Sequence, residues 1–191
     1  MKHKYNNDIY LGAVYDSMRI VGYRPEQFFI NIKPICGYQK IIWGPAFTTK
    51  GQIVKNDSNY SELDNIRINI YNKKNFTDKP IVLLEANDTY CAHSGDITSQ
   101  IYQSLGSTGF ITDGNIRDVD KVEKLNYPVF CLDSNPIDAI NYWALTDYQV
   151  PIKIMGVKIF PGDFIFASRD GVIRVQKNDL EIFNKNLNMI L

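Results

Sequence analysis

The residues with the clearest chemistry lie in one segment, Gly95–Asp118. The segment begins with Gly95 and Asp96 and ends in a turn that carries Arg117 and Asp118, and twenty residues separate Asp96 from Arg117. A helix followed by a returning strand spans that distance, so the two carboxylates and the guanidinium are predicted to meet at one end of a sheet. Carboxylate oxygens are ligands that Mg²⁺ or Mn²⁺ prefers, and an arginine fork can clamp a substrate oxyanion. The pattern predicts a small metal-assisted site.

The same residues also have an ordinary structural interpretation. Asp113-Gly114-Asn115 is a common surface turn, because Gly and Asn tolerate left-handed backbone. Asp118 precedes a short predicted helix over 118–125 and could serve only as its N-cap. The spacing alone favours this interpretation, since an aspartate and a distant Arg-Asp pair have no metal-ligand signature of their own.

The start of the segment suits an anionic ligand. Gly95 removes a side chain where the backbone must approach another group closely, and the N–H groups of Ile97 and Thr98 lie in the first turn of a predicted helix. A 2-oxo acid could present its carboxylate there and chelate a divalent ion with its carboxylate and keto oxygens. Arg117 would then supply a positive charge at the developing enolate oxygen. No lysine lies in Gly95–Asp118, so a metal-dependent mechanism is favoured over a Schiff base.

Motifs along nearly the whole chain resemble one family, which contains 4-hydroxy-4-methyl-2-oxoglutarate aldolase and the regulator of ribonuclease activity A. Its aldolases carry an aspartate, twenty residues and then Arg-Asp, a pattern that Asp96, Arg117 and Asp118 fit. The resemblance covers roughly residues 10–176. The other matching runs are Trp43–Thr48, Asp64-Asn65, Pro128–Phe130, Val150–Asp163 and Asp170–Val175.

The resemblance implies a role for each residue of the segment. Asp118 would bind a divalent ion, Mg²⁺ or Mn²⁺, directly, and Asp96 would hold metal-bound water and help to transfer protons. The residues Gly95, Asp96, Ile97 and Thr98 would hold the substrate together with Arg117. The implied activity is a class II type aldolase that releases pyruvate from a 4-hydroxy-2-oxo acid, with oxaloacetate decarboxylation as a side reaction.

The resemblance also implies an assembly and leaves an alternative function open. Family members form homotrimers or multiples of them, and the aldolases take an acidic residue from a neighbour's C-terminal region. The late acids here are Asp179 and Glu181. The family's regulator branch suggests instead a non-catalytic protein that binds a protein partner, such as an RNA-processing assembly.

Composition narrows the class of protein. The 191 residues carry 21 basic and 21 acidic side chains, so no basic surface for nucleic acid or for a membrane is indicated. No apolar run reaches the length of a membrane span and the N-terminus lacks a signal-peptide core, so we expect a cytoplasmic protein.

Cys36, Cys91 and Cys131 are widely spaced and are expected to be buried, reduced residues. His93 is expected to be a loop histidine with a local hydrogen bond.

Hydrophobic patterning predicts an α/β fold over a single domain, residues 1–191. Strands over 80–86, 109–112 and 127–132 alternate with helices that begin at Asp96, with Ser94 as N-cap, and at Asp118, forming a βαβ core. The family's layered, swivelling β/β/α arrangement agrees with this core. The remaining expectations are helices over 8–22, 66–71 and the C-terminal tail, two strands in 35–43 closed by Gly44-Pro45, and short strands at 150–154, 157–160, 164–167 and 172–175.

Overall fold

The centre of the fold is a pair of consecutive βαβ units, as the sequence predicts. A computed structural model describes the chain except for residues 1–4, 6–7, 38–40 and 55–59. Three strands lie side by side and parallel, and a helix follows each of the first two. In chain order these elements are β4 (Ile81–Glu85), α3 (Asp96–Leu105), β6 (Gly109–Thr112), α4 (Val119–Lys124) and β8 (Val129–Cys131).

The central strand β4 is buried along its whole length because both of its faces are covered. Val82 and Leu84 pack into the core beneath the helices, whereas Ile81 and Leu83 pack into a second core. That second core lies under a hairpin of β11 (Ile152–Ile154) and β12 (Val157–Ile159). A continuous apolar run is what a strand covered on both faces requires.

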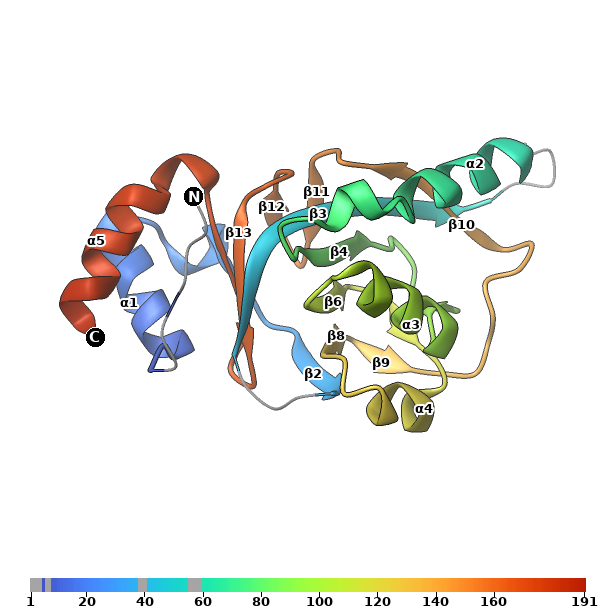
Figure 1. Cartoon of the computed structure of the whole chain (residues 1–191), viewed down its shortest axis with the longest axis horizontal. Coiled ribbons are helices and arrows are strands. Elements are labelled where there is room, and N and C mark those ends of the chain that lie inside the picture. The colour runs from blue at the N-terminus through green and yellow to red at the C-terminus, as the bar shows by residue number, and fades with distance from the viewer. Residues whose placement is uncertain (1–4, 6–7, 38–40, 55–59) are drawn as a thin grey trace.

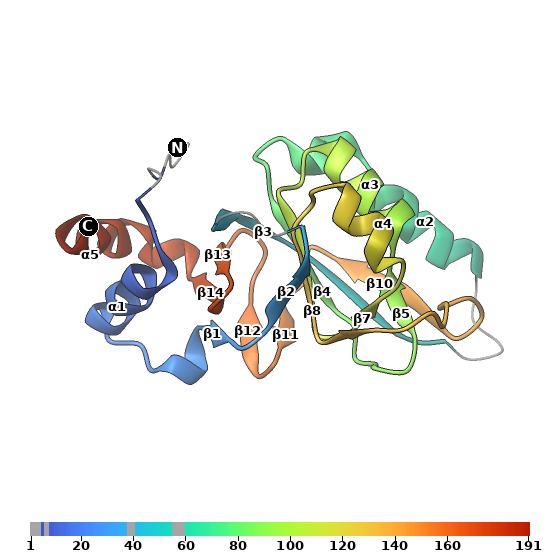
Figure 2. The ribbon, with the colours of Figure 1, turned by 90° about the horizontal axis from the view of Figure 1, so that it is seen from below.

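The layers are visible in Figure 2, where α2 (Tyr60–Ile70), α3 and α4 lie on one side of the sheet and the β11–β12 hairpin lies on the other. Two further helices, α1 (Leu11–Val21) and α5 (Leu180–Ile190), pack against each other at the opposite end of the molecule (Figure 1). They cover a third core, to which Phe166 and Phe183 belong. The α/β class and its layered arrangement are therefore confirmed.

The main sheet has nine strands, in the order β1-β14-β13-β3-β4-β6-β8-β2, with β10 paired to β3. The terminal run of short strands predicted from turn residues is present, and β10 is a strand that the sequence did not indicate. The remaining bounds are β1 (Phe29–Ile30), β2 (Lys33–Cys36), β3 (Ile42–Ile53), β10 (Trp143–Tyr148), β13 (Phe164–Ser168) and β14 (Gly171–Val175); 3-10 turns cover Pro25–Gln27, Lys73–Phe76 and Lys177–Asp179.

The prediction that a strand closes at Gly44-Pro45 was wrong, because β3 runs through both residues. Pro45 is the last residue of β3 to pair with β13, and Ala46 is the first to pair with β4. A proline lacks the N–H that a ladder needs, so it is tolerated where one pairing ends and the next begins. The predicted strand residues 38–40 lie outside the described part of the chain.

A second, three-stranded parallel sheet stands beyond the ends of the βαβ strands. It consists of β5 (Ala92–Ser94), β7 (Asn115–Ile116) and β9 (Asp133–Ser134), in the order β5-β7-β9. Each of these strands follows one main strand along the chain, in the order β4, β6, β8. This small sheet collects the segments that carry the predicted site residues. Among the described residues, no helix is both long enough and apolar enough to cross a membrane.

Candidate functional site

The pairing of β5 with β7 brings the two ends of the Gly95–Asp118 segment together. Ser94 is opposite Ile116, and the backbone N–H of Arg117 donates to the carbonyl oxygen of Ser94 over 3.0 Å. Gly95 follows β5 directly and Arg117 follows β7 directly. The six residues singled out from the sequence therefore lie at the carboxyl ends of β5 and β7 and in the first turn of α3.

The residue that starts α3 differs from the expectation. Gly95 rather than Ser94 is the N-cap, because Ser94 still belongs to β5 through its bond with Arg117. The buried Ser94 hydroxyl has no hydrogen-bond partner within the described residues. The helix ends at Gly106, whose left-handed backbone (φ 109°) is a common way to end a helix.

The space around Gly95 leaves no room for a side chain at this position. A Cβ at this position would lie 2.9 Å from Oδ2 of Asp118 and 3.1 Å from Cγ of Arg117. Its φ of −158° is extended backbone that any residue adopts, so the constraint is the close passage of two side chains. The glycine thus allows the Arg117 and Asp118 side chains to cross the end of β5.

Asp118 does not cap its helix in the usual way. It precedes α4 with a left-handed backbone (φ 59°, ψ 36°), and its side chain makes no capping hydrogen bond. The carboxylate instead lies 3.3 Å from Nε of Arg117 and is 31% exposed. A left-handed non-glycine residue costs about 1 kcal/mol, less for Asp, so this conformation is maintained by its surroundings. The geometry argues against an interpretation of Asp118 as a cap alone.

Asp96 faces Asp118 from the first turn of α3. Burial by itself would raise the pKa of Asp96, but hydrogen bonds from the Ile97 N–H and from Lys121, and the interaction with the Asp118 carboxyl group, outweigh it and lower the pKa. Asp96 is therefore ionised near neutral pH. Two hard carboxylates within reach of each other are the donor set that Mg²⁺ or Mn²⁺ accepts, with water filling the other positions.

Lys121 is a residue of the site that sequence reasoning missed. Its Nζ lies 3.4 Å from Oδ2 of Asp96. It is three residues after Asp118, so a helix starting at Val119 presents both on one side. It lies just outside Gly95–Asp118, and its helical spacing from Asp118 is the sequence signal that points to it. Its side chain is 66% exposed and paired with a carboxylate, whereas Schiff-base lysines are typically desolvated amines.

The first-turn amides of α3 have different partners. The Ile97 N–H is engaged by the Asp96 carboxylate, and the Ile97 side chain is 67% exposed. The Thr98 side chain hydrogen-bonds to Tyr71, away from Asp118. Because the helix ladder does not use the amides of its first turn, Thr98 can offer its backbone N–H, but not its hydroxyl, to an anion.

Arg117 has a second carboxylate partner that the sequence did not indicate. Its Nη1 lies 3.8 Å from Oδ2 of Asp138, in the loop after β9. The late acids Asp179 and Glu181, which the resemblance would place in a neighbouring subunit's site, do not approach Arg117 of their own chain: the carboxylate of Asp179 accepts the Tyr23 hydroxyl over 2.7 Å. Asp179 and Glu181 lie where α5 begins, away from α3 and α4 (Figure 1).

A second group of potential metal ligands, Asp88, Cys91 and His93, lies in β5 and in the loop before it, with Cys91 buried and the side chains of His93 and Asp88 0% and 6% exposed. Oδ2 of Asp88 lies 3.1 Å from Nε2 of His93 and 3.5 Å from Sγ of Cys91, and Sγ lies 3.6 Å from Nε2. Those separations have the size of one face of a tetrahedral metal site. The spacing alone would therefore accept a zinc ion.

Hydrogen bonding argues against a resident metal there. Nδ1 of His93 accepts the backbone N–H of Asn115 over 3.3 Å, so the ring proton lies on Nε2 and points at Asp88. A metal bound to Nε2 would move that proton to Nδ1, where it would face the Asn115 N–H, so two donors would oppose each other. Burial and the neighbouring Asp88 raise the pKa of the Cys91 thiol to about 12, and the thiol donates to Asp88. The group is a hydrogen-bonded anchor. The local hydrogen bond expected for His93 is confirmed, but the expected loop position was wrong, because His93 lies in β5.

The anchor joins the elements around the site. Asp88 also accepts the Tyr142 hydroxyl over 3.1 Å. The His93 ring packs against Trp143, with 4.6 Å between the ring centroids, and fills the space beside Gly114. These contacts connect β5, β7 and the loop before β10. All three cysteines are buried and unpaired, as expected.

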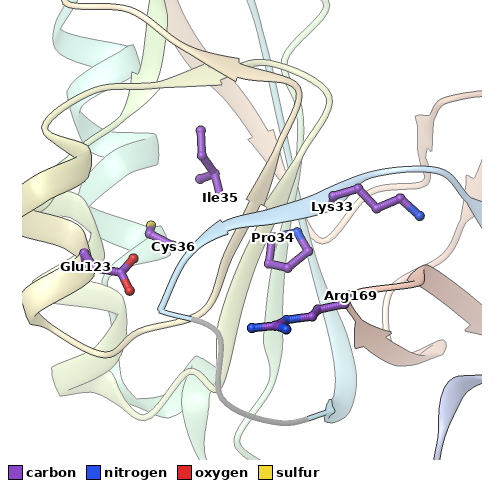
Figure 3. A pocket seen from close by; sticks show the side chains of 6 residues that line it. All are labelled: Lys33, Pro34, Ile35, Cys36, Glu123 and Arg169. Atoms are coloured by element: carbon purple, nitrogen blue, oxygen red, sulfur yellow. The ribbon is translucent and has the colours of Figure 1, made fainter.

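An open pocket of about 450 Å³ on the β2 side of α4 contains none of the six predicted site residues (Figure 3). Glu123 in this pocket already accepts the Gly37 N–H over 3.0 Å. In this protein the arrangement of charged side chains therefore indicates the candidate site better than the volume of a pocket does. The pocket is lined by Lys33, Pro34, Ile35, Cys36, Glu123 and Arg169.

Comparisons with known proteins identify relatives of this chain. The chain is 30% identical over 168 residues to protein DlpA of Legionella pneumophila, covering 85% of this chain and 26% of that one. It is 37% identical over 101 residues to a Halalkalibacterium halodurans protein provisionally named 4-hydroxy-4-methyl-2-oxoglutarate aldolase, covering 53% and 48% of the two chains. The chain thus spans about a quarter and about half of the lengths of these relatives.

Solved structures show the same fold. The crystal structure of RraAS2 from Streptomyces coelicolor, described as an unusual member of the RNase ES inhibitor RraA protein family, superimposes with a TM-score of 0.79 at 20% identity. The superposition covers 96% of this chain and 88% of that one. The family model described as aldolase/RraA matches residues 12–174, most of the chain. The chain therefore belongs to the RraA-like family.

Proposed function

We propose that this protein is a divalent-metal-dependent lyase that cleaves the C–C bond of a 4-hydroxy-2-oxo acid and releases pyruvate. The observation that carries the proposal is the position of the Asp118 carboxylate. It makes no capping bond, lies 3.3 Å from Nε of Arg117 and faces Asp96 across the end of β5. Relatives named as aldolases support a lyase.

The donor set fits Mg²⁺ or Mn²⁺. Asp118 would hold the ion directly, and Asp96 would hold it through a water molecule, since Mg²⁺ usually takes one or two carboxylates and keeps several waters. Gly95 supports this fit, because a side chain there would fill the space beside Oδ2 of Asp118. When bound, the ion would polarise the keto oxygen of the substrate.

The protein's own groups would bind and orient the substrate. The positive end of the α3 dipole and the Thr98 N–H favour the 2-oxo acid carboxylate. Arg117 would donate to the oxygen on which negative charge develops as the C–C bond breaks. Asp96, ionised near neutral pH, would accept the proton of the 4-hydroxyl group and return a proton to the product carbon. Oxaloacetate decarboxylation develops charge on the same oxygen, so the same residues would support it.

We also infer assembly into a homotrimer or a multiple of one, on which a complete site would depend. Tyr90, Ile97 and Ile140 are 60%, 67% and 74% exposed. Contiguous exposed apolar surface marks protein–protein interfaces, and these side chains belong to the segments that carry the site: before β5, at the start of α3 and just after Asp138. Light scattering at micromolar concentration should give a mass of three or six chains; a monomer would contradict the inference.

The alternative function is a non-catalytic regulator that binds a protein partner, such as an RNA-processing assembly. The observation that favours it is the likeness to RraAS2 over 96% of this chain. Affinity purification from the native cell lysate discriminates between the two functions. A stoichiometric protein partner together with no catalysis would support the regulator.

The experiment that tests the lyase is direct. Purified protein is incubated with Mg²⁺ or Mn²⁺ and a panel of 4-hydroxy-2-oxo acids and oxaloacetate, and pyruvate is followed with lactate dehydrogenase and NADH. Pyruvate should appear in metal-replete buffer and cease on addition of EDTA. No pyruvate from any member of the panel would refute the proposal.

A further inference from the structure

One carboxylate oxygen of Asp118 cannot interact equally well with the Arg117 guanidinium and with a metal ion. Its Oδ2 is the atom that lies 3.3 Å from Nε of Arg117, and in the proposed function the same carboxylate coordinates the ion. We propose that Asp138 is a positioning residue that keeps the Arg117 guanidinium in its substrate-binding orientation when Asp118 turns to the metal. This inference rests on the proposed function.

The loop that carries Asp138 is attached to both strands of the site. The Asn135 N–H donates to the carbonyl of Ile116 over 3.0 Å, next to Arg117. The Ala92 N–H donates to the carbonyl of Ile137 over 2.8 Å, in the strand that leads to Gly95. Because these bonds connect the loop with β7 and β5, Asp138 is placed relative to Arg117 by backbone contacts.

The Asp138 side chain is itself held by a local bond. Its Oδ1 accepts the Ile140 N–H over 3.0 Å, which fixes the rotamer. Oδ2 is then directed towards Arg117, 3.8 Å from Nη1. One oxygen thus fixes the carboxylate while the other interacts with the guanidinium.

Two carboxylates on different nitrogens fix the orientation of a planar guanidinium. Asp118 lies beside Nε and Asp138 beside Nη1, and Arg carries five N–H donors in a rigid fork. Donors therefore remain for a substrate oxygen when both acids are engaged. The side chains of Arg117 and Asp138 are 39% and 49% exposed, so their pairing contributes orientation far more than stability.

The test compares Asp138→Asn with Asp147→Asn, an exposed aspartate in β10 that contacts none of these residues. Asparagine can still accept the Ile140 N–H, so the loop should keep its turn while the negative charge is lost. The first readout is the arginine Nε–H NMR signal of Arg117, assigned by its absence in Arg117→Lys. Asp138→Asn should shift this signal with or without Mg²⁺, and should accelerate its exchange with water several-fold when Mg²⁺ is present and Asp118 no longer holds Nε.

The second readout is binding of oxalate, a planar analogue of a 2-oxo acid, by calorimetry in the presence of Mn²⁺. Asp138→Asn should weaken oxalate binding about tenfold and change Mn²⁺ affinity less than twofold, while Asp147→Asn changes neither. An unchanged Arg117 signal, or an equal loss of Mn²⁺ and oxalate affinity, would overturn the inference. If the wild-type protein binds no oxalate and releases no pyruvate but the Arg117 signal still responds, the proposed function fails and the positioning contact stands.

Discussion

The backbone N–H of Arg117 donates to the carbonyl oxygen of Ser94 over 3.0 Å, and this bond joins the two halves of the candidate site. Beyond it, the Arg117 and Asp118 side chains cross the Cα of Gly95, and Asp96 begins α3. The relative positions of the charged groups therefore depend on strand pairing between β5 and β7.

Replacing Arg117 with lysine keeps the charge and removes the planar fork. We expect the unfolding temperature to be unchanged. We expect kcat/KM to fall by an amount that corresponds to a loss of roughly 2–4 kcal/mol of transition-state stabilisation, the range for a lost oxyanion donor. Steady-state kinetics of pyruvate release and thermal unfolding provide the measurements. Arg67→Lys, on the exposed face of α2, is the matched control; equal activities of the two variants would contradict the role.

Asp118→Asn separates a metal ligand from a helix cap. Asparagine tolerates left-handed backbone and caps a helix about as well as aspartate, so stability should change by less than about 0.5 kcal/mol. Metal affinity should fall because a neutral amide is a poorer ligand, and excess Mn²⁺ should restore part of the rate. Calorimetric titration measures the Mn²⁺ affinity of the variant. An unchanged Mn²⁺ affinity together with unchanged activity would mean that the role of Asp118 is structural.

Gly95→Ala tests the close approach of side chains. The new Cβ would lie 2.9 Å from Oδ2 of Asp118, so that carboxylate must move, whereas the extended backbone at Gly95 accepts alanine. We expect metal and oxalate binding to weaken about tenfold or more with a small effect on unfolding. Gly12→Ala, in α1, should leave both ligands unaffected. Normal ligand binding by Gly95→Ala would show that the space beside Asp118 is not needed.

The buried His93 predicts a pH dependence of stability. Burial lowers the pKa of His93 despite the neighbouring Asp88, so the unfolded chain, with a His pKa of about 6.5, binds the proton more readily than the folded one. The stabilisation is complete above that value and is lost as pH falls from about 6.5 towards the folded pKa. The free energy of unfolding of the wild type, measured in urea, should decrease over this pH range, and the decrease should be smaller in His93→Gln. Identical pH profiles would contradict the prediction.

Lys121 distinguishes the two aldolase mechanisms. A metal-dependent lyase needs no covalent adduct, so borohydride with pyruvate should trap none on the wild-type protein. Lys121→Met should cost at most about 1 kcal/mol of stability, because its pairing with Asp96 is exposed to solvent. Since Lys121 helps to lower the Asp96 pKa, the acidic limb of the pH–rate profile should move to higher pH. A trapped adduct, absent from Lys121→Met, would replace the metal mechanism by a Schiff base.

Much of the fold follows from local pattern. The apolar run of β4 and the glycine that stops α3 at Gly106 are properties of neighbouring residues, and both are present. The buried face of α3 is not local in this sense, because Ile97 is 67% exposed and the helix buries Ser99 and Tyr102. Errors arose where pairing partners decided the outcome. The strand through Pro45 depends on the change from β13 to β4, and β10 exists because Trp143–Tyr148 pairs with the far half of β3.

The sequence by itself determined which residues approach each other along the Gly95–Asp118 segment, because a strand, a helix and a returning strand have fixed lengths. Only the tertiary structure decided what surrounds them. Asp138 reaches Arg117 through a loop held by β5 and β7, and Lys121 reaches Asp96 through the rotation of α4. Such contacts depend on the direction of each side chain after the sheet and helices have packed, and that direction is set by residues distant in the chain.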